Sequence, residues 1–293
     1  MTTTVQQWLD SAARPVDVTH PDAPADDLRP LGRLARGASV VALGTAVRVA
    51  REPSVAAHRA LRLLVEEEGF RALLLEGDDP VRTGLAAYVA GGGGEPGELV
   101  AGARPFWRTA EIVGVLRWLR GYNARHPDDP VRFVRVGEWT EGVERGLADD
   151  VSRWHGETGD RIVHWGGYAH TAAAPMEGRR TAGSLLRERL GEAYVSVGLT
   201  YHHGRVPEVL GPPGDGLAEA VLGAAGADAY LLGLRGADGL PEAVRAWLAG
   251  PARVRIVGPD PAAPLIADGA SLREWFDALL HIRTLTPAHP ATA

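Results

Sequence analysis

Residues 40–52 read Val-Val-Ala-Leu-Gly-Thr-Ala-Val-Arg-Val-Ala-Arg-Glu, and the fold class is first visible in this stretch. The apolar run Val40–Leu43 ends at Gly44, as a buried strand does when it delivers a loop to one edge of a sheet. A helix is expected over residues 54–68, because apolar residues recur there at helical spacing. The stretch therefore predicts a strand, a loop and a helix that form one unit of an α/β sheet.

The same alternation of strand and helix continues along the chain. Further strands are predicted at residues 71–75, 131–136, 161–165, 194–199, 230–234 and 253–257, and an edge strand is expected at the end of 275–282. Helical patterns lie between most of them, which favours an α/β fold with a largely parallel central sheet and helices on both faces. The 293 residues are expected to form a single domain over 1–293.

Composition excludes several classes of site. The chain has no cysteine and its 31 basic side chains are all arginine, so disulfides, thiolate catalysis, a Schiff-base lysine and a P-loop lysine are excluded. The net charge of −6 argues against a nucleic-acid partner or an anionic membrane. Residues 1–9 lack the features of a signal peptide, and no stretch approaches the roughly 18 apolar residues that cross a bilayer, so a cytoplasmic protein is expected. Abundant Ala, Gly, Arg and Pro are typical of GC-rich genomes and indicate an actinobacterial source.

Several separate stretches carry a resemblance to a known family. They are Leu-Val-Glu-Glu-Glu-Gly-Phe at 64–70 with Leu-Leu-Leu-Glu at 73–76, Trp-Arg-Thr-Ala-Glu at 107–111 with Trp-Leu-Arg-Gly-Tyr-Asn at 118–123, Ile-Val-His-Trp-Gly-Gly-Tyr-Ala-His at 162–170, the residues Gly183, Leu186, Gly191 and Tyr194, and Phe-Asp-Ala at 276–278. In this order they resemble the patterns of the erythromycin esterase-like family over nearly the whole chain. The resemblance implies the fold of that family and a hydrolase-like scaffold.

The sequence departs from that family at the residues that carry its chemistry. Relatives usually read Gly-Glu-x-x-His-Gly after the first strand, whereas this chain has Thr45 at the Glu position and Arg48 at the His position. Of the family's His-Asn-x-His motif only the last member is kept, as His170, with Tyr168 in place of Asn. Relatives also carry a long helical insertion before that motif, and the short interval 137–161 implies that the helical cap is reduced or missing.

These departures change the chemistry expected at the site. A neutral His near its pKa suits a general base, whereas Arg keeps its proton at working pH. Arg48 is therefore expected to bind a carboxylate or to stabilise charge on a carbonyl oxygen. Proton transfer is expected to have moved to Glu76, Glu111 or His170. Two alternatives stay open: Glu76 forms an ion pair with Arg48 or Arg51, and Glu111 serves only the dipole of its helix.

Other residues are candidates for contact with the substrate. They are Thr45, Arg51, Glu52, Trp107, Tyr168, His202 and His203. The adjacent pair His202 and His203 is expected to point to opposite sides of an extended chain. No metal-ligand spacing accompanies this pair, so neither a metal nor another cofactor is expected.

Three functions remain open. The first is an enzyme of specialised-metabolite biosynthesis, on a polyketide-like or macrolide-like substrate, that performs cyclisation, dehydration or an atypical ester or lactone hydrolysis. The second is a pseudoenzyme that binds a small molecule without turnover, and the third is a macrolide-resistance esterase. The expected partner in each is a small molecule.

Overall fold

A computed structural model describes most of the chain. The described residues are 3–77, 79–137, 140, 142–206, 208–236, 239–258 and 265–291. No helix in these ranges is both long and apolar enough to cross a membrane.

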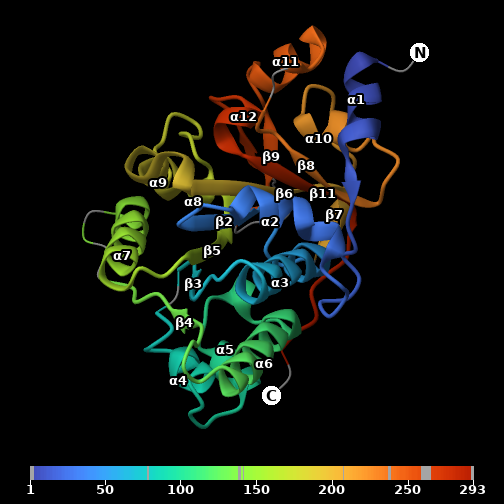
Figure 1. The fold of residues 1–293 in the computed structure, drawn as a ribbon. Coiled ribbons are helices and arrows are strands. Elements are labelled where there is room, and N and C mark those ends of the chain that lie inside the picture. The colour runs from blue at the N-terminus through green and yellow to red at the C-terminus, as the bar shows by residue number, and fades with distance from the viewer. Residues whose placement is uncertain are drawn as a thin grey trace.

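A central sheet runs through the molecule in the order β1-β8-β11-β6-β2-β5-β3-β4, and β7 pairs with β6 outside this path (Figure 1). The strands are β1 (Arg14–Pro15), β2 (Val40–Thr45), β3 (Ala72–Leu75), β4 (Arg132–Phe133), β5 (Ile162–Gly167), β6 (Tyr194–Val206), β7 (Glu208–Leu210), β8 (Ala229–Gly233) and β11 (Ala278–Leu285). Every pair from β11 across to β4 is parallel, whereas β8, β1 and β7 pair antiparallel. The prediction of an α/β fold with a largely parallel sheet is confirmed.

Of the α-helices, one precedes β1, and the others lie in the connections between the strands. They are α1 (Thr4–Ala12), α2 (Arg29–Ala35), α3 (Arg51–Glu66), α4 (Leu85–Val89), α5 (Pro96–Ala101), α6 (Ala110–Arg125), α7 (Val143–Thr158), α8 (Tyr168–Thr171), α9 (Ala182–Leu190), α10 (Ala218–Leu222), α11 (Glu242–Ala249) and α12 (Leu272–Trp275). Where a long insertion was expected to be reduced, the described residues between β4 and β5 form the single helix α7.

Two hydrophobic layers hold the helices against the sheet. Because side chains alternate along a strand, Val40 and Ala42 of β2 face α7 and α9, whereas Val41 and Leu43 face the layer that contains α3 and α6. Figure 1 shows α7 with α9 on one side of the sheet and α3 with α6 on the other. The expected helices on both faces are therefore present.

The last strand differs from its prediction. β11 lies between β6 and β8 in the interior of the sheet, not at an edge. The physical reason is that residues 278–282 are buried on both faces, as an interior strand requires. The strand predicted at 253–257 is present as β9 (Val254–Ile256), but it pairs with β10 (Leu265–Ala267) in a separate two-stranded sheet.

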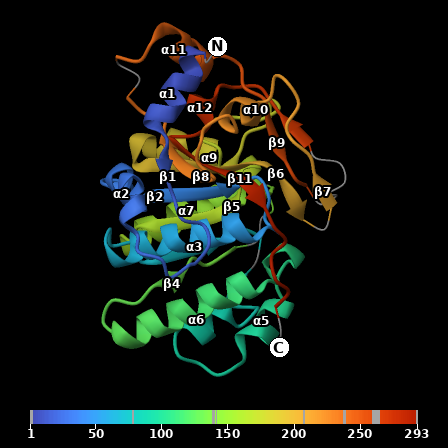
Figure 2. The same cartoon turned by 90° about the vertical axis from the view of Figure 1, so that its right-hand side faces the viewer.

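After β11 the chain leaves the sheet and runs past α3 to α6 (Figure 2). Short antiparallel bridges join Ala50 to Pro287 and Thr109 to Pro290. The C-terminal segment, residues 286–291, thus connects the helix layer on one face with the loop that follows β2.

Candidate functional site

The carboxyl ends of β2 and β5 meet the short helix α8. Gly44 of β2 lies beside Gly166 of β5, and a Cβ atom on Gly44 would lie 2.0 Å from Thr171 Oγ1 and 2.9 Å from the Cα atom of Tyr168. Only a glycine leaves room for α8 to rest directly on the end of β2. This close approach fixes the position of His170, which α8 carries.

Glu76 is the first residue after β3, and its buried carboxylate is held from two sides. Its Oε1 atom lies 2.5 Å from Arg48 Nη1, and its Oε2 atom accepts the backbone N–H of Gly167 at 2.7 Å. Burial by itself would raise the pKa of Glu76, but the charges of Arg48 and His170 and the Gly167 N–H outweigh burial and hold that pKa below its usual value. Glu76 is therefore a carboxylate anion at neutral pH, and the sequence-based alternative of an ion pair with Arg48 is realised.

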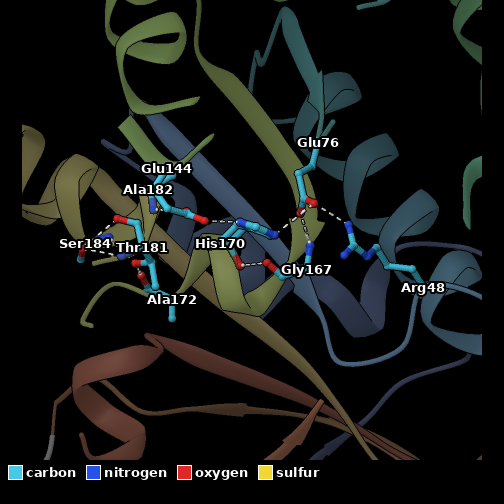
Figure 3. A network of polar contacts seen from close by, with 10 residues as sticks. Arg48, Glu76, Glu144, Gly167, His170, Ala172, Thr181, Ala182 and Ser184 are labelled. Carbon is cyan, nitrogen blue, oxygen red and sulfur yellow. Dashed lines mark hydrogen bonds and ion pairs between the residues drawn. The ribbon is translucent and has the colours of Figure 1, made fainter. Parts of the chain in front are cut away.

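His170 lies between two carboxylates (Figure 3). Its Nδ1 atom is 2.6 Å from Glu144 Oε1, and its Nε2 atom is 3.3 Å from Glu76 Oε1. Burial would lower the pKa of His170, but the hydrogen bond to Glu144 and the charges of Glu76 and Glu144 raise it above its usual value. The imidazole therefore tends to carry both protons near neutral pH, which suits a general acid.

Glu144 is the member of the site that sequence reasoning missed. It lies in the first turn of α7, and its Oε2 atom accepts the N–H of Ala182 at 2.8 Å, at the start of α9. One signal in the sequence could have identified Glu144. It comes shortly after the loop 137–142, which follows the strand predicted at 131–136, and ligands bind at the carboxyl ends of such strands. The helix dipole alone explains a carboxylate in the first turn of a helix, so the presence of Glu144 there did not indicate a functional residue.

The four side chains form one row of alternating charge, Arg48, Glu76, His170 and Glu144. The Arg48 guanidinium also lies over the Phe106 ring, 3.9 Å from its centroid. His170 and Glu144 line a pocket of about 450 Å³, which also contains Arg179. The row can donate a proton from His170 to a bound molecule, while Glu76 and Glu144 stabilise the imidazolium.

Three predicted binding residues pack behind this row. Trp107 is buried and donates its indole N–H to the carbonyl of Glu76 at 2.9 Å. Thr45 is buried with its hydroxyl 3.3 Å from the carbonyl of Gly166. Tyr168 is also buried, and its hydroxyl donates to the carbonyl of Arg255. These three side chains support the loops of the site and do not line its pocket.

Three further candidates lie along α3, α6 and the C-terminal segment. The Glu52 carboxylate accepts two hydrogen bonds from Thr286, one from the backbone N–H at 2.8 Å and one from the side-chain hydroxyl at 2.5 Å. Glu111 lies 2.7 Å from His289 Nδ1. Arg51 donates to the carbonyl of Thr19 and lines, with Glu111 and His289, a separate pocket of about 270 Å³. The structure thus does not bring these three residues into contact with the Glu76–His170 pair.

The histidine pair lies on β6. The Nδ1 atoms of His202 and His203 are 2.9 Å apart, so the expectation that the two rings point to opposite sides is wrong. The strand backbone is irregular beside them at Gly204, which lies within β6 and has a φ of 149°. Within the described ranges no group of three or more His, Cys, Asp or Glu side chains is placed to hold a metal ion.

The fold is a hydrolase-type α/β scaffold that carries this row of charged residues at the carboxyl edge of its sheet. A family model described as erythromycin esterase matches residues 65–136 and 138–285. The chain belongs to the erythromycin esterase family. The matched ranges contain Glu76, Glu144 and His170, whereas the altered loop at 44–52 precedes them.

A curated relative and three solved structures are similar to this chain. An erythromycin esterase type II from Escherichia coli is 27% identical over 118 residues, which are 40% of this chain and 28% of that protein. The chain therefore matches well under two thirds of the length of this relative.

The structural neighbours share the fold at low sequence identity. A Bacillus cereus protein superposes with a TM-score of 0.81 at 22% identity over 100% of both chains. A succinoglycan biosynthesis protein gives 0.80 at 19% identity over 99% of this chain and 98% of the other. A mutant of the erythromycin esterase EreC in its open conformation gives 0.66 at 13% identity over 96% of this chain and 100% of the other.

Proposed function

We propose that this chain is a metal-independent acid–base enzyme in which His170 transfers the proton. The observation that carries the proposal is the position of His170, at a pocket and between the carboxylates of Glu76 and Glu144. Arg48 occupies the position that resembles the family's base, and it keeps its proton. The family's usual route through that base is therefore closed, and His170 is the group that can exchange a proton.

The same cycle serves two reaction types. In hydrolysis of an ester or lactone, water adds to the carbonyl carbon, the acyl C–O bond breaks, the leaving oxygen takes the proton of His170, and the proton lost by the water restores it. In a dehydration, a C–OH bond breaks, the hydroxyl leaves as water with that proton, and a proton from the neighbouring carbon returns to the imidazole. In both, Glu76 and Glu144 stabilise the charged ring.

The substrate class is proposed from the family. The similar proteins include an erythromycin esterase and a succinoglycan biosynthesis protein. The first name refers to a macrolide antibiotic and the second to a biosynthetic pathway. We therefore propose a polyketide-like or macrolide-like small molecule, handled in specialised-metabolite biosynthesis in the cytoplasm of an actinobacterium. Cyclisation, dehydration and atypical hydrolysis all remain within this proposal.

A non-catalytic binding protein is the second candidate. The Arg48–Glu76 pair favours it, because the guanidinium neutralises the carboxylate and neither group then exchanges protons at neutral pH. A macrolide-resistance esterase ranks third. Thr45 and Arg48 stand at the positions where relatives in the family usually carry the Glu and the His of the site.

The first experiment replaces His170 with Ala and follows a panel of esters, lactones and polyols, erythromycin included, by mass spectrometry. The expected loss in kcat is on the order of 100-fold, as for removal of a general acid. His20, an exposed histidine, provides the matched control as His20→Ala. Turnover that survives in His170→Ala overturns the proposed role. If the protein binds a compound of the panel but converts none, the result supports the non-catalytic binding protein. A ring-opened macrolide product supports the macrolide-resistance esterase.

A second variant tests the direction of the pKa shift. Glu144→Gln removes an anion that raises the pKa of His170, so that pKa falls. Because a general acid must be protonated, the alkaline limb of the pH–rate profile is expected to move to lower pH. A limb that stays in place contradicts the assignment of His170 as the acid.

A further inference from the structure

Two adjoining pockets meet at His170. One has a volume of about 450 Å³ and the other about 160 Å³, and four residues line both: Glu144, His170, Arg179 and Arg180. Arg179 and Arg180 are therefore near any molecule that places its reacting group at His170 from either pocket.

Arg179 differs from the other cations around these pockets. Arg180 is paired with Glu188, and Arg145 lies 4.0 Å from Asp149. Across the part of the chain that the structure describes, the Arg179 guanidinium has neither a hydrogen bond nor an ion pair.

The carboxylates that line the pockets do not neutralise Arg179. Glu144 is engaged by His170 and by the N–H of Ala182. Glu177 lines the smaller pocket and has no described ion pair with Arg179. The Arg179 guanidinium is therefore unpaired among the described residues beside the proton donor.

A tight turn presents this charge. Met176 and Arg179 form an antiparallel bridge with N–H to O distances of 3.0 and 2.8 Å, and Glu177 and Gly178 between them have φ values of 50° and 69°. A positive φ is unfavourable for glutamate, which has a Cβ atom. The N–H of Glu177 donates to the carbonyl of Asp268 at 2.9 Å, so the turn is also anchored at its tip. The backbone that carries Arg179 is thus fixed from both sides.

The remaining pocket walls are apolar. The larger pocket is lined by Val143 and Leu185, and the smaller by Met176, Ile256 and Leu265. Leu265 is 55% exposed, so it offers apolar surface that a ligand could cover. The walls suit a hydrocarbon skeleton, and the unpaired guanidinium suits one anionic group on it.

We propose that Arg179 binds a carboxylate of the substrate, so that the substrate is a monoanionic acid with an apolar skeleton. This inference rests on the proposed function, because it places the reacting group at His170. A single guanidinium fork matches the two oxygens of a carboxylate in one plane. The unpaired guanidinium of Arg179 can pair with one carboxylate, which gives charge complementarity at this point of the pocket.

The test is a calorimetric binding titration at low salt. The two ligands are octanoate and its neutral isostere octanamide. Octanoate is expected to bind, and Arg179→Gln is expected to weaken it about tenfold or more, because a charge-assisted hydrogen bond is lost. Octanamide binding stays unchanged in that variant. Arg36→Gln removes the same charge from an exposed arginine outside these pockets and leaves both affinities unchanged.

Two further arms separate the possible outcomes. Equal octanoate affinity in the wild-type protein and in Arg179→Gln overturns the inference, as does an absence of octanoate binding to the wild type. Octyl phosphate that binds more tightly than octanoate overturns the carboxylate assignment. His170→Ala keeps octanoate binding if the inference holds, so a loss of turnover there tests the proposed function separately.

Discussion

At the scale of single residues, Glu219 is a carboxylate poorly suited to its surroundings. It is completely buried in α10, with one oxygen accepting the N–H of Arg255 at 2.7 Å. The other oxygen has no hydrogen-bond partner among the described residues. Burial raises the pKa of Glu219 to about 7, although the Arg255 N–H opposes that rise.

This raised pKa predicts a pH-dependent stability. The folded state binds the Glu219 proton more tightly than the unfolded state does, so its contribution to stability is greatest below pH 4.5 and is lost as the pH rises towards 7. The loss is about 3 kcal/mol at most. Glu219→Gln is expected to reduce this slope in urea unfolding between pH 4.5 and 7.5. The exposed Glu67→Gln is the control, and equal slopes in the two variants would contradict the prediction.

Residues of the site could be predicted to different extents. Arg48, Glu76 and His170 all occupy positions of quoted motifs, and each follows a strand whose carboxyl end faces the site. Glu144 lies outside those motifs and reaches His170 only because α9 packs against both α7 and α8. Glu52 and Glu111 look equally functional in sequence, yet they bind the C-terminal segment, whose path no local pattern reveals.

At the scale of elements, the contact between β2 and α8 decides where His170 lies. Gly44→Ala is expected to displace α8, since the new Cβ atom would lie 2.9 Å from the Cα atom of Tyr168. We expect a loss of about 1–3 kcal/mol in the free energy of unfolding, together with reduced turnover. Urea unfolding and kcat measure the two effects.

Gly114 provides the matched control in α6, because nothing lies within 4 Å of the Cβ position there. Gly114→Ala is expected to stabilise the protein by about 0.5–1 kcal/mol, since alanine favours the helix. Gly44→Ala with wild-type stability and activity would show that α8 does not depend on this close approach.

At the scale of the whole molecule, the C-terminal segment joins parts that are distant in sequence. Glu52, at the start of α3, holds Thr286 through two hydrogen bonds. Glu52→Gln weakens these charge-assisted bonds, and we expect a loss of about 1–2 kcal/mol. Hydrogen exchange of the amides of residues 286–291 should accelerate. Unchanged protection of these amides would show that the two bonds do not anchor the segment.

Local sequence patterns predict the overall architecture, but they do not predict the order of the strands in the sheet. Apolar runs and helical spacing predict most strands and helices, and their alternation predicts the parallel sheet. The position of β11 depends on pairing with β6 and β8, which are distant in sequence: Ala278 pairs with Val197, 81 residues before it, and with Gly233, 45 residues before it. Such distant pairings leave no trace in a single run of residues, so the predicted edge strand became an interior one.

That interior place of β11 also constrains how the protein is made. Ribosomes deliver the chain from its N-terminus, so β6 and β8 emerge before the strand that must lie between them. Until Leu285 has been synthesised, the facing edges of β6 and β8 stay unpaired and open to aggregation. This half of the sheet can close only after Leu285 has emerged from the ribosome, and the nascent protein is expected to need chaperone protection until then.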